Sequence, residues 1–360
     1  MTTATLEPTT IDPSKLEAFV GQALGELGAT LNAALVVMGD QLGLYKAMAG
    51  AGHVTAADLA QHTGVTERYV REWLNAQAAG GYVTYDPAAG TYTLPPEQAV
   101  CLTDETSPYF LPGAYQLFAA SVRDEPSITE AARTGTGFGW GQHSQGVFDG
   151  CERFFRPGYA ANLVASWIPA LDDVEAKLKA GAKVLDIGCG HGSSTILMAK
   201  AYPNSQFVGV DAHAGSIATA RERAIEAGLE DRVRFDVASA KDAAGEGYDL
   251  AASFDSLHDM GDPVGAARHV RAALVPDGTW LIVEPFANDR IEDNLNPIGR
   301  IYYAASTLLC TPSSLSQEVG LALGAQAGER RLREVILEGG FTRFRRATET
   351  PFNIILEARP

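Results

Sequence analysis

The sequence predicts an α/β fold: a seven-stranded, mostly parallel sheet that ends in an antiparallel hairpin, preceded by a smaller, α-rich N-terminal domain. Three observations carry this prediction. A buried-strand pattern at residues 183–187 runs into a glycine-rich turn at 188–192, with the sequence GCGHG. Strand and helix patterns then alternate regularly, which is typical of βαβ units and a parallel sheet. The last two strand patterns are joined by a connection too short for a parallel crossover, so they should pair antiparallel.

Length and composition are those of an ordinary globular protein. The 360 residues suffice for two domains, and 46% hydrophobic against 20% charged residues is usual for such proteins. No uninterrupted apolar run approaches the roughly 18 residues of a membrane helix. The Thr-rich segment 1–11 has no signal-peptide pattern. We therefore expect a cytoplasmic protein with no membrane partner.

The cysteines and the net charge restrict the partners further. The four cysteines are scattered along the chain without a CxxC pair, at Cys101, Cys151, Cys189 and Cys310. We therefore expect neither a disulfide framework nor a metal site. The formal net charge of −16 disfavours a nucleic acid partner, because binding to phosphates depends on cationic side chains. A cationic or neutral small molecule is easier to accommodate.

Residues 1–100 have the pattern of a winged-helix domain. A loosely structured lead-in at 1–29 runs into a helix, with Asp12-Pro13 as a start signal. Thr55 and Asp58 have the spacing of a capping box for a later helix. Helical patterns lie at 31–48, from residue 55, and at 66–79. They are followed by the two alternating strand patterns of a wing, at 82–85 and 91–94.

A winged helix often reads DNA, but the charge of this one argues for another role. Residues 31–100 hold three basic side chains against six acidic ones, and the third helix has no basic cluster. We expect this domain to pack against a second copy and form a homodimer. A DNA-binding regulator remains the alternative.

Residues 101–180 form a helical segment rich in proline and aromatic residues. We interpret it as a linker and pocket cap between the N-terminal domain and the α/β domain at 181–360. Its aromatic side chains could form a core between the domains or the roof of a ligand pocket: Trp140, Phe148, Phe154, Phe155, Tyr159 and Trp167.

The α/β domain should contain five parallel strands and a terminal hairpin. The parallel strands are expected at 183–187, 206–210, 233–237, 248–254 and 279–284. Helices are expected between them at 194–201, 215–227 and 263–273. The hairpin strands are expected at 341–348 and 351–357.

The glycine turn carries a carboxylate that bears on which cofactor could bind. The dinucleotide fingerprint G-x-G-x-x-G is not met, because the third glycine falls one position early, at Gly192, and Ser193 takes its place. Asp186, just before the turn, would repel a pyrophosphate but attract an ammonium group. Asp211, at the end of the second strand, could accept hydrogen bonds from ribose hydroxyls, as in dinucleotide folds.

With these motifs the chain resembles the class I S-adenosylmethionine-dependent methyltransferases. The resemblance covers residues 181–360: 184–192 is similar to the first motif and 208–211 to the second. It implies S-adenosyl-L-methionine as the cofactor, with Gly188 and Gly190 at its methionine part and Asp211 at its ribose.

The same resemblance implies further cofactor contacts. Ala212 and His213 follow the second strand, and Ser239 and Ala240 belong to the third motif, in which Ser239 takes the place of an acid. The end of the fourth strand should lie beside the sulfonium, with Phe254, Asp255 and Ser256.

Methyl transfer to a hydroxyl group needs a base when the acceptor must lose a proton, as a phenol of pKa ~10 does. His258 follows the fourth strand at the edge of the sheet where ligands bind. The segment 255–262 is similar to the His-Asp-Trp stretch of plant and bacterial small-molecule O-methyltransferases, in which the histidine is the base. Met260 replaces their tryptophan. That resemblance implies catalysis by His258; a structural role for the histidine remains the alternative.

The acceptor pocket is predicted from residues near this edge. Glu284 could orient an acceptor or fix its own loop, and His143 could reach the pocket or lie on a surface loop. The further candidates are aromatic: Trp140, Phe155, Tyr159, Tyr302 and Tyr303. We expect a methyltransferase that acts on a hydroxyl oxygen of a small molecule. An N- or C-methyltransferase, or a regulator that senses S-adenosylmethionine, is the alternative.

Overall fold

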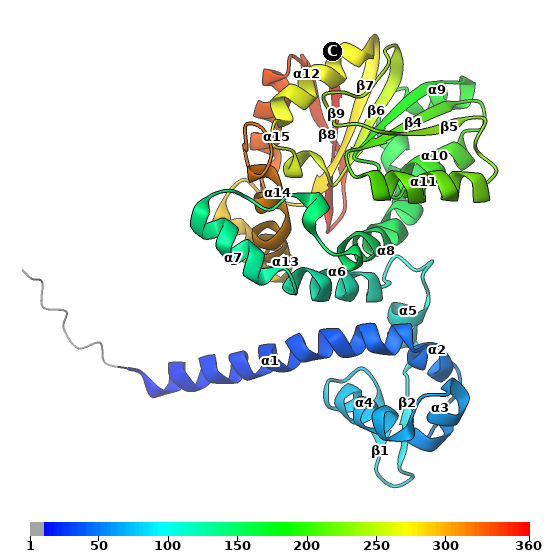
Figure 1. Cartoon of the computed structure of the whole chain (residues 1–360), viewed down its shortest axis with the longest axis vertical. Helices are drawn as coiled ribbons and strands as arrows, with labels where there is room; N and C mark the ends of the chain where they lie inside the picture. Colours follow the sequence, from blue (N-terminus) through cyan, green and yellow to red (C-terminus); the bar gives the residue numbers. More distant parts are fainter. Residues whose placement is uncertain (1–10) are drawn as a thin grey trace, which may run out of the picture. The chain divides into compact units, whose positions relative to one another are not determined.

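The computed structural model describes residues 11–360 and divides the chain into two compact units, Met1–Asp104 and Glu105–Pro360 (Figure 1). The first ten residues of the expected lead-in lie outside the described part. Residues 105–180 belong to the second unit, so the segment expected to be a separate linker and cap packs with the α/β domain.

The first unit begins with a long helix, α1 (Pro13–Gln41), which takes in most of the expected lead-in. The predicted start signal is confirmed, because Asp12 caps the helix and its Oδ1 accepts from the Ser14 amide at 2.9 Å. The helix expected at 31–48 is two helices, since Gly43 adopts a left-handed φ of 68° before α2 (Leu44–Met48).

The rest of the first unit has the predicted winged-helix layout. Thr55 and Asp58 form the predicted capping box at the start of α3. Edge-to-face packing of Tyr45 on Trp73, with centroids 4.9 Å apart, joins α2 to α4 in its core. The remaining elements are α3 (Ala56–Thr63), α4 (Glu67–Ala79), the hairpin β1 (Thr84–Asp86) and β2 (Thr91–Thr93), and α5 (Pro96–Thr103).

Helix α1 buries few of its side chains. Within residues 11–360 it is the one helix long and apolar enough to cross a membrane, judged by length and composition alone. An exposed apolar stripe runs along it, formed by Leu16, Val20, Leu24, Leu27 and Leu31. These positions repeat every three or four residues, so they share one face of the helix.

The second unit contains the predicted seven-stranded sheet, in the order β5-β4-β3-β6-β7-β9-β8. The first five strands pair in parallel, and the last two pair antiparallel as predicted. The strands are β3 (Lys183–Ile187), β4 (Gln206–Asp211), β5 (Val233–Val237), β6 (Tyr248–Phe254), β7 (Leu274–Pro285), β8 (Arg343–Glu349) and β9 (Asn353–Arg359).

Helices cover both faces of this sheet, because its strands are apolar on both faces. Successive side chains of a strand point to opposite faces: Val184 joins one core and Leu185 the other. Helices α9 (Val174–Ala180), α10 (Ser193–Ala201) and α11 (Ala214–Glu226) contribute to the first core. Helices α12 (Pro263–Ala273) and α15 (Gly328–Glu338) contribute to the second.

A further helical layer closes one end of the sheet (Figure 1). Helices α6 (Pro112–Val122) and α8 (Gln145–Asn162) approach closely, since a Cβ on Gly113 or Gly150 would lie 2.5 Å or less from the other helix's backbone. The layer also contains α7 (Glu125–Thr134), η1 (Trp140–Gln142), α13 (Pro297–Ala305) and α14 (Thr311–Leu315), while η2 (Leu163–Trp167) and η3 (Ile168–Ala170) lead from α8 toward α9. The remaining elements are short internal turns. The turn η4 (Leu257–Asp259) follows β6, η5 (Ile291–Asn294) precedes α13, and the π-helical turn η6 (Ser306–Cys310) joins α13 to α14.

Candidate functional site

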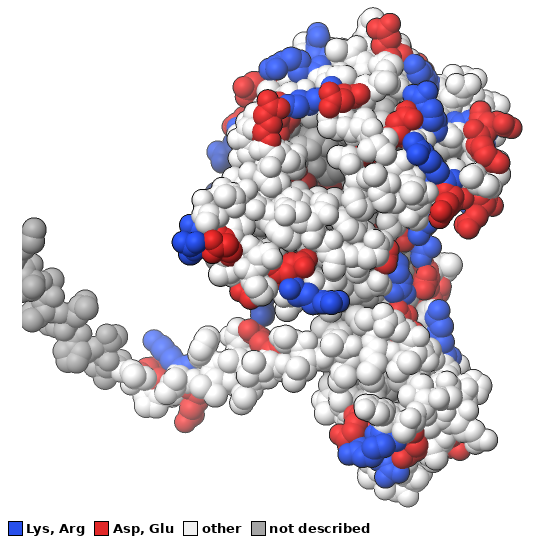
Figure 2. Space-filling model, viewed as in Figure 1, with Lys and Arg blue, Asp and Glu red and all other residues white. Residues whose placement is uncertain are grey.

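A cavity of about 510 Å³ lies in the second unit, at the carboxyl ends of β3, β4 and β6. Strand β3 pairs with β4 on one side and β6 on the other, so the cavity sits where the strand order reverses. Ligands of open α/β sheets bind at this topological switch point. Figure 2 shows the hollow in the face of this unit, bordered largely by uncharged surface.

The glycine turn after β3 forms one wall of the cavity. Gly188 and Cys189 donate their amides to the Val210 carbonyl of β4 at 2.8 and 3.0 Å, which fixes the turn on the neighbouring strand. A Cβ on Gly188 would lie 2.7 Å from the Ser256 side chain, and one on Gly190 would meet only open space. Gly190 also has a left-handed φ of 52°. The backbone therefore leaves room for a ligand directly over the turn.

Asp186 does not line this cavity, contrary to the expectation that it holds the ammonium group of a ligand. It shares the sheet face of Val184, and its Oδ2 accepts hydrogen bonds from the Ser194 and Thr195 hydroxyls of α10, both at 2.6 Å. Its Oδ1 is buried without a hydrogen-bond partner within residues 11–360. Burial raises the pKa of Asp186 to about 6, although the two hydroxyls lower it. Its direct role is to hold α10 beneath the glycine turn.

Asp211 lies where the sequence places it, at the end of β4 and in the cavity wall. Its Oδ2 accepts from the Gly190 amide at 3.0 Å and its Oδ1 from the His213 amide at 2.8 Å. Burial raises the pKa of Asp211 and these two amides lower it. The carboxylate is thus fixed against the glycine turn, where it can accept from hydroxyl groups of a ligand.

Small side chains continue this wall beyond Asp211. Ala212, Ser239 and Ala240 line the cavity as expected, and the Ser239 hydroxyl donates to Asp242 at 2.6 Å. Asp242, which also lines the cavity, therefore supplies an acid in the motif where Ser239 replaces one. His213 does not line the cavity: its Nδ1 accepts from the Ser216 amide at the start of α11.

The end of β6 forms the floor of the cavity. Phe254, Asp255 and Ser256 all line it, as expected. Asp255 is held in a left-handed conformation with φ of 50°, and its carboxylate accepts from the Tyr159 hydroxyl at 3.0 Å and the Asn353 amide group at 2.9 Å. Burial, and next the charge of Glu284, raise the pKa of Asp255 to about 7. Strain and a raised pKa on one buried carboxyl are frequent at functional sites.

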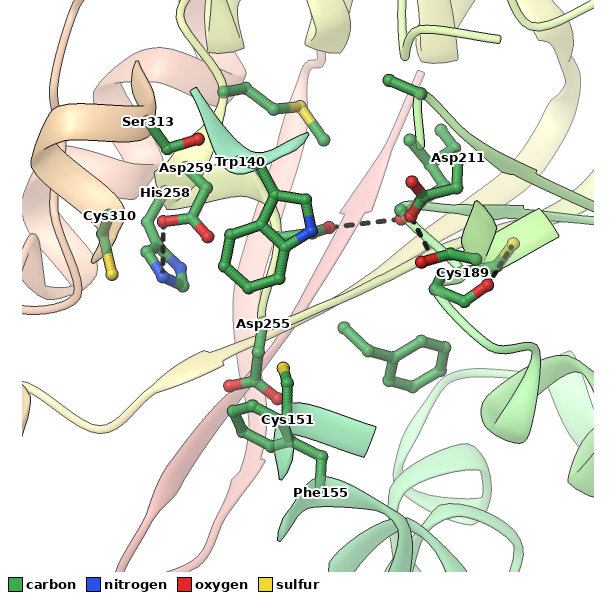
Figure 3. Close-up of a pocket in the computed structure, with 18 of the residues that line it drawn as sticks. Trp140, Cys151, Phe155, Cys189, Asp211, Asp255, His258, Asp259, Cys310 and Ser313 are labelled. Atoms are coloured by element: carbon green, nitrogen blue, oxygen red, sulfur yellow. Dashed lines mark hydrogen bonds and ion pairs between the residues drawn. The ribbon is translucent and has the colours of Figure 1, made fainter. Parts of the chain in front are cut away.

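His258 stands on the opposite side of the cavity from Asp211 and Cys189 (Figure 3). Its Nδ1 lies 2.5 Å from Glu284 Oε2, and Glu284 Oε1 accepts from the Leu257 amide at 2.9 Å. Its Nε2 lies 3.2 Å from Asp259 Oδ1. Burial lowers the pKa of His258, but the charges of Asp259 and Glu284 raise it, and the result is well above the ordinary value. The neutral imidazole expected near pH 7 is therefore less populated than the sequence suggested.

Glu284 does not line the cavity, so its predicted part in holding an acceptor is not a direct one. It is almost completely buried at the end of β7, next to β6 in the sheet. Its two oxygens fix the His258 ring and the backbone before it. This is the geometry of a base and the carboxylate that orients it.

Some of the aromatic candidates for the acceptor pocket line the cavity and others do not. Trp140, Phe155, Tyr159 and Tyr302 line the cavity, and the Tyr302 hydroxyl donates to the Phe352 carbonyl at 2.8 Å. Tyr303 and His143 do not line it. The His143 ring is buried, with its Nδ1 2.7 Å from Asp124 Oδ2, so it is not on a surface loop either.

The sequence named the aromatic residues of α8 that line the cavity, but it missed the polar ones between them and the η6 turn. Cys151, Glu152 and Arg156 share the cavity face of α8, which repeats every three or four residues, with Phe148, Phe155 and Tyr159. That periodicity was readable from the aromatic residues. Cys310 and Ser313, which line the cavity with His258, carried no such signal, because they lie some fifty residues further along the chain.

Family models match both units. Residues 30–104 match the Rv2258c-like winged HTH domain, and residues 178–318 match a methyltransferase domain. The chain carries a winged HTH domain and a methyltransferase domain. The predicted family resemblance is confirmed at this level.

Curated relatives of the methyltransferase domain act on different acceptors by their names. The trans-aconitate 2-methyltransferase of Paracidovorax citrulli is 35% identical over 108 residues, 30% of this chain and 40% of that protein. The ubiquinone biosynthesis O-methyltransferase of Ruegeria pomeroyi is 35% identical over 28% of this chain and 39% of that protein. The phosphoethanolamine N-methyltransferase 1 of Triticum aestivum is 34% identical over 36% of this chain and 26% of that protein. The match thus spans 40% or less of the length of each.

Solved structures share the fold of the whole chain. The mitomycin 7-O-methyltransferase MmcR has a TM-score of 0.70 at 20% identity, covering 96% of this chain and 100% of that one. Human N-acetylserotonin methyltransferase, solved with S-adenosylmethionine, has a TM-score of 0.69 at 15% identity, covering 98% and 99%. At these identities the likeness shows the fold, which confirms the predicted architecture of both parts of the chain.

Proposed function

We propose that this protein is an S-adenosylmethionine-dependent methyltransferase that methylates a hydroxyl oxygen of a small aromatic molecule. One observation carries the proposal. The glycine turn with Asp211 and the His258–Glu284 pair face each other across one continuous cavity. One side suits the methyl donor and the other suits an acceptor that must lose a proton.

The residues on the donor side fit S-adenosylmethionine. The space over Gly190 admits the backbone-like methionine part, and Asp211 can accept from ribose hydroxyls. The half-buried carboxyl of Asp255 lies on the floor between the two sides, where a negative charge favours a sulfonium cation. When bound, the cofactor supplies a methyl group on a positively charged sulfur, ready for in-line displacement.

The residues on the acceptor side fit an aromatic hydroxyl compound. Trp140, Phe155 and Tyr302 supply flat apolar surfaces, and His258 Nε2 is the nitrogen that is free of Glu284. His258 takes the hydroxyl proton on Nε2 as the oxygen attacks. Glu284 accepts the hydrogen bond from Nδ1–H and stabilises the imidazolium that forms.

Calorimetry on the full chain tests the donor side. S-adenosylmethionine should bind at one site per chain, and absence of binding would contradict the proposal. A low-salt gel shift tests the alternative of a regulator. Retention of particular DNA sequences would favour that alternative. The net negative charge of the winged-helix region argues against DNA binding.

We also propose that the protein is a homodimer joined through the apolar stripe of α1. Leu24, Leu27 and Leu31 are 63%, 64% and 73% exposed in the single chain. The stripe follows one face, and the adjoining face carries the exposed Phe19 together with a Gln22–Glu26 hydrogen bond. A helix apolar on one face favours pairing with a second copy over crossing a bilayer, where every face meets lipid. The four free cysteines support a reducing, cytoplasmic compartment.

Light scattering on the purified full chain tests this assembly. The wild type should have the mass of a dimer, and Leu24→Glu with Leu27→Glu should give a monomer. Tyr69→Glu, on the exposed surface of α4, is the matched control and should stay dimeric. A wild-type monomer that sediments with lipid vesicles would contradict the dimer and indicate a membrane partner.

A further inference from the structure

The cavity also brings together three side chains of types that bind metals, one of which is His258. His258, Asp259 and Cys310 each offer one ligand atom, and these atoms all lie within 4.8 Å of one another. His258 and Asp259 belong to the turn after β6, whereas Cys310 ends the π-helical turn η6 between α13 and α14. The fold therefore brings them together from two separate segments, on the left of the close-up in Figure 3.

The surroundings of this cluster are those of a cation site. Asp259 Oδ1, which lies 3.2 Å from His258 Nε2, is buried and has no hydrogen-bond partner within residues 11–360. The charge of this carboxylate is compensated by the His258 ring, and a divalent cation between the two side chains would compensate it further. All three side chains line the cavity, so a fourth position is open to water or a ligand.

The second ring nitrogen of His258 supplies an independent argument. Nδ1 is held by Glu284 at 2.5 Å, so Nε2 is the nitrogen left to face Asp259 and Cys310. Metal-binding histidines almost always donate their other N–H to a carboxylate or carbonyl, which fixes the ring for the metal. Glu284 occupies that position, and its second oxygen is fixed by the Leu257 amide.

We propose that His258, Asp259 and Cys310 bind one zinc-class divalent cation in this cavity. A thiolate, an imidazole and a carboxylate suit Zn²⁺ or Co²⁺, whereas Mg²⁺ and Ca²⁺ require sets of oxygen ligands. Three protein ligands with one open position form a tetrahedral site. The ligand atoms would have to close to roughly 3.5 Å apart, as bond lengths of about 2.0–2.3 Å require. Binding releases two protons to solvent, that of the Cys310 thiol and that on Nε2 of the protonated His258 ring.

This site regulates the reaction if the proposed function holds, since the cation and the acceptor proton compete for His258 Nε2. Zn²⁺ should therefore inhibit methyl transfer, and a chelator should restore it. The glycine turn and Asp211 lie on the opposite side of the cavity, so affinity for S-adenosylmethionine should not change (Figure 3).

Cobalt titration of the tag-free, chelator-treated full chain tests the site without any activity measurement. One Co²⁺ per chain should bind and produce the near-ultraviolet charge-transfer band of a thiolate–cobalt bond. Cys310→Ser should lose this band, and Cys151→Ser should keep it. Cys151 is the matched control, a second cysteine in the same cavity that is outside the cluster. Glu284→Gln should weaken Co²⁺ binding by roughly 10- to 100-fold.

The contradicting results are equally specific. A wild-type chain that binds S-adenosylmethionine but gives no thiolate–cobalt band overturns the metal site and leaves the proposed function standing. A band that survives Cys310→Ser also overturns it. If Cys310→Ser does not fold by circular dichroism, Asp259→Asn replaces it, and undiminished Co²⁺ affinity in that variant contradicts the site. Zn²⁺ that binds but stimulates methyl transfer overturns the inhibitory role.

Discussion

The His258 imidazole and the Glu284 carboxylate are joined by Nδ1 and Oε2 at 2.5 Å, across the ends of the neighbouring strands β6 and β7. Both side chains are buried, and only His258 lines the cavity. The contact fixes the ring and leaves Nε2 free of Glu284, at 3.2 Å from Asp259 Oδ1. It also raises the pKa of His258, together with Asp259, against the lowering effect of burial.

The pH dependence of methyl transfer should reveal this raised pKa. A general base acts in its neutral form, so turnover should rise as the pH increases through the pKa of His258, at values above 6.5. Glu284→Gln removes one of the charges that raise the pKa of His258, so the rise should move to lower pH. Initial rates on a phenolic acceptor between pH 6 and 9 measure this shift. Identical profiles for the two proteins would exclude the pair as base and orienting group.

Removal of the base should slow chemistry without weakening the donor site. His258→Gln should lower kcat by roughly 100- to 10,000-fold on an acceptor with a pKa ~10, the usual contribution of general base catalysis. Calorimetry should find the S-adenosylmethionine affinity within about twofold of wild type. An acceptor that is already ionised at the assay pH is the control, and its turnover should fall far less. Unchanged turnover on the high-pKa acceptor would assign His258 a structural role.

Asp211 should carry much of the donor affinity. Asp211→Asn removes the charge that ribose hydroxyls would meet and disturbs the bond from the Gly190 amide. Hydrogen bonds to charged groups contribute about 1.5–3 kcal/mol, so the Kd should rise roughly 10- to 100-fold. Asp236→Asn, on β5 and outside the cavity, is the matched control and should bind as wild type does. Equal affinities in both variants would remove Asp211 from the donor site.

Asp255 should make the affinity for the cationic donor depend on pH. Its pKa is raised to about 7, so the carboxylate gains its charge as the pH rises from 6 to 8. Affinity for S-adenosylmethionine should increase over this range, and affinity for S-adenosylhomocysteine, whose sulfur is neutral, should increase less. Calorimetry with both ligands at three pH values measures the difference. In Asp255→Asn the two ligands should respond alike; a donor-specific rise that persists there contradicts this role.

Asp186 should contribute to stability more than to direct ligand contact. Asp186→Ala leaves the Ser194 and Thr195 hydroxyls without their acceptor, so the free energy of unfolding should fall by about 1–3 kcal/mol. Its folded pKa of about 6 lies above the unfolded value, so its ionisation costs stability as the pH rises from about 4 to 6. Asp186→Asn should flatten that pH dependence. Urea unfolding at several pH values measures both effects, and an unchanged midpoint in Asp186→Ala would contradict them.

The sequence predicted the five parallel strands and the antiparallel end of the sheet in the second unit, because period-2 patterns, glycine turns and short connections are local signals. The spatial order of the strands was not predicted, because it depends on how the crossovers pack. Asp211 and His258 both line the cavity, since both follow a parallel strand at its carboxyl end, and their roles in binding and catalysis stay predictions. The same rule could have placed Glu284 beside His258, because β6 and β7 are adjacent in the sheet.

Other features depend on packing that no local pattern records. Asp186 stands on the face that α10 covers, and only the position of Ser194 and Thr195 shows that its carboxylate is satisfied there. Cys310 reaches His258 through the π-helical turn after α13, which the spacing of the cysteines does not reveal. The raised pKa of His258 likewise depends on two carboxylates that meet only in the folded chain.

O-methylation with His258 as the base is decided by the transfer of labelled methyl from S-adenosylmethionine to a panel of phenols, catechols and amines. We expect label on the oxygen of at least one phenol or catechol with the wild-type chain, and strongly reduced label with His258→Gln under the same conditions. Label confined to amines, or equal labelling by wild type and His258→Gln, would contradict it.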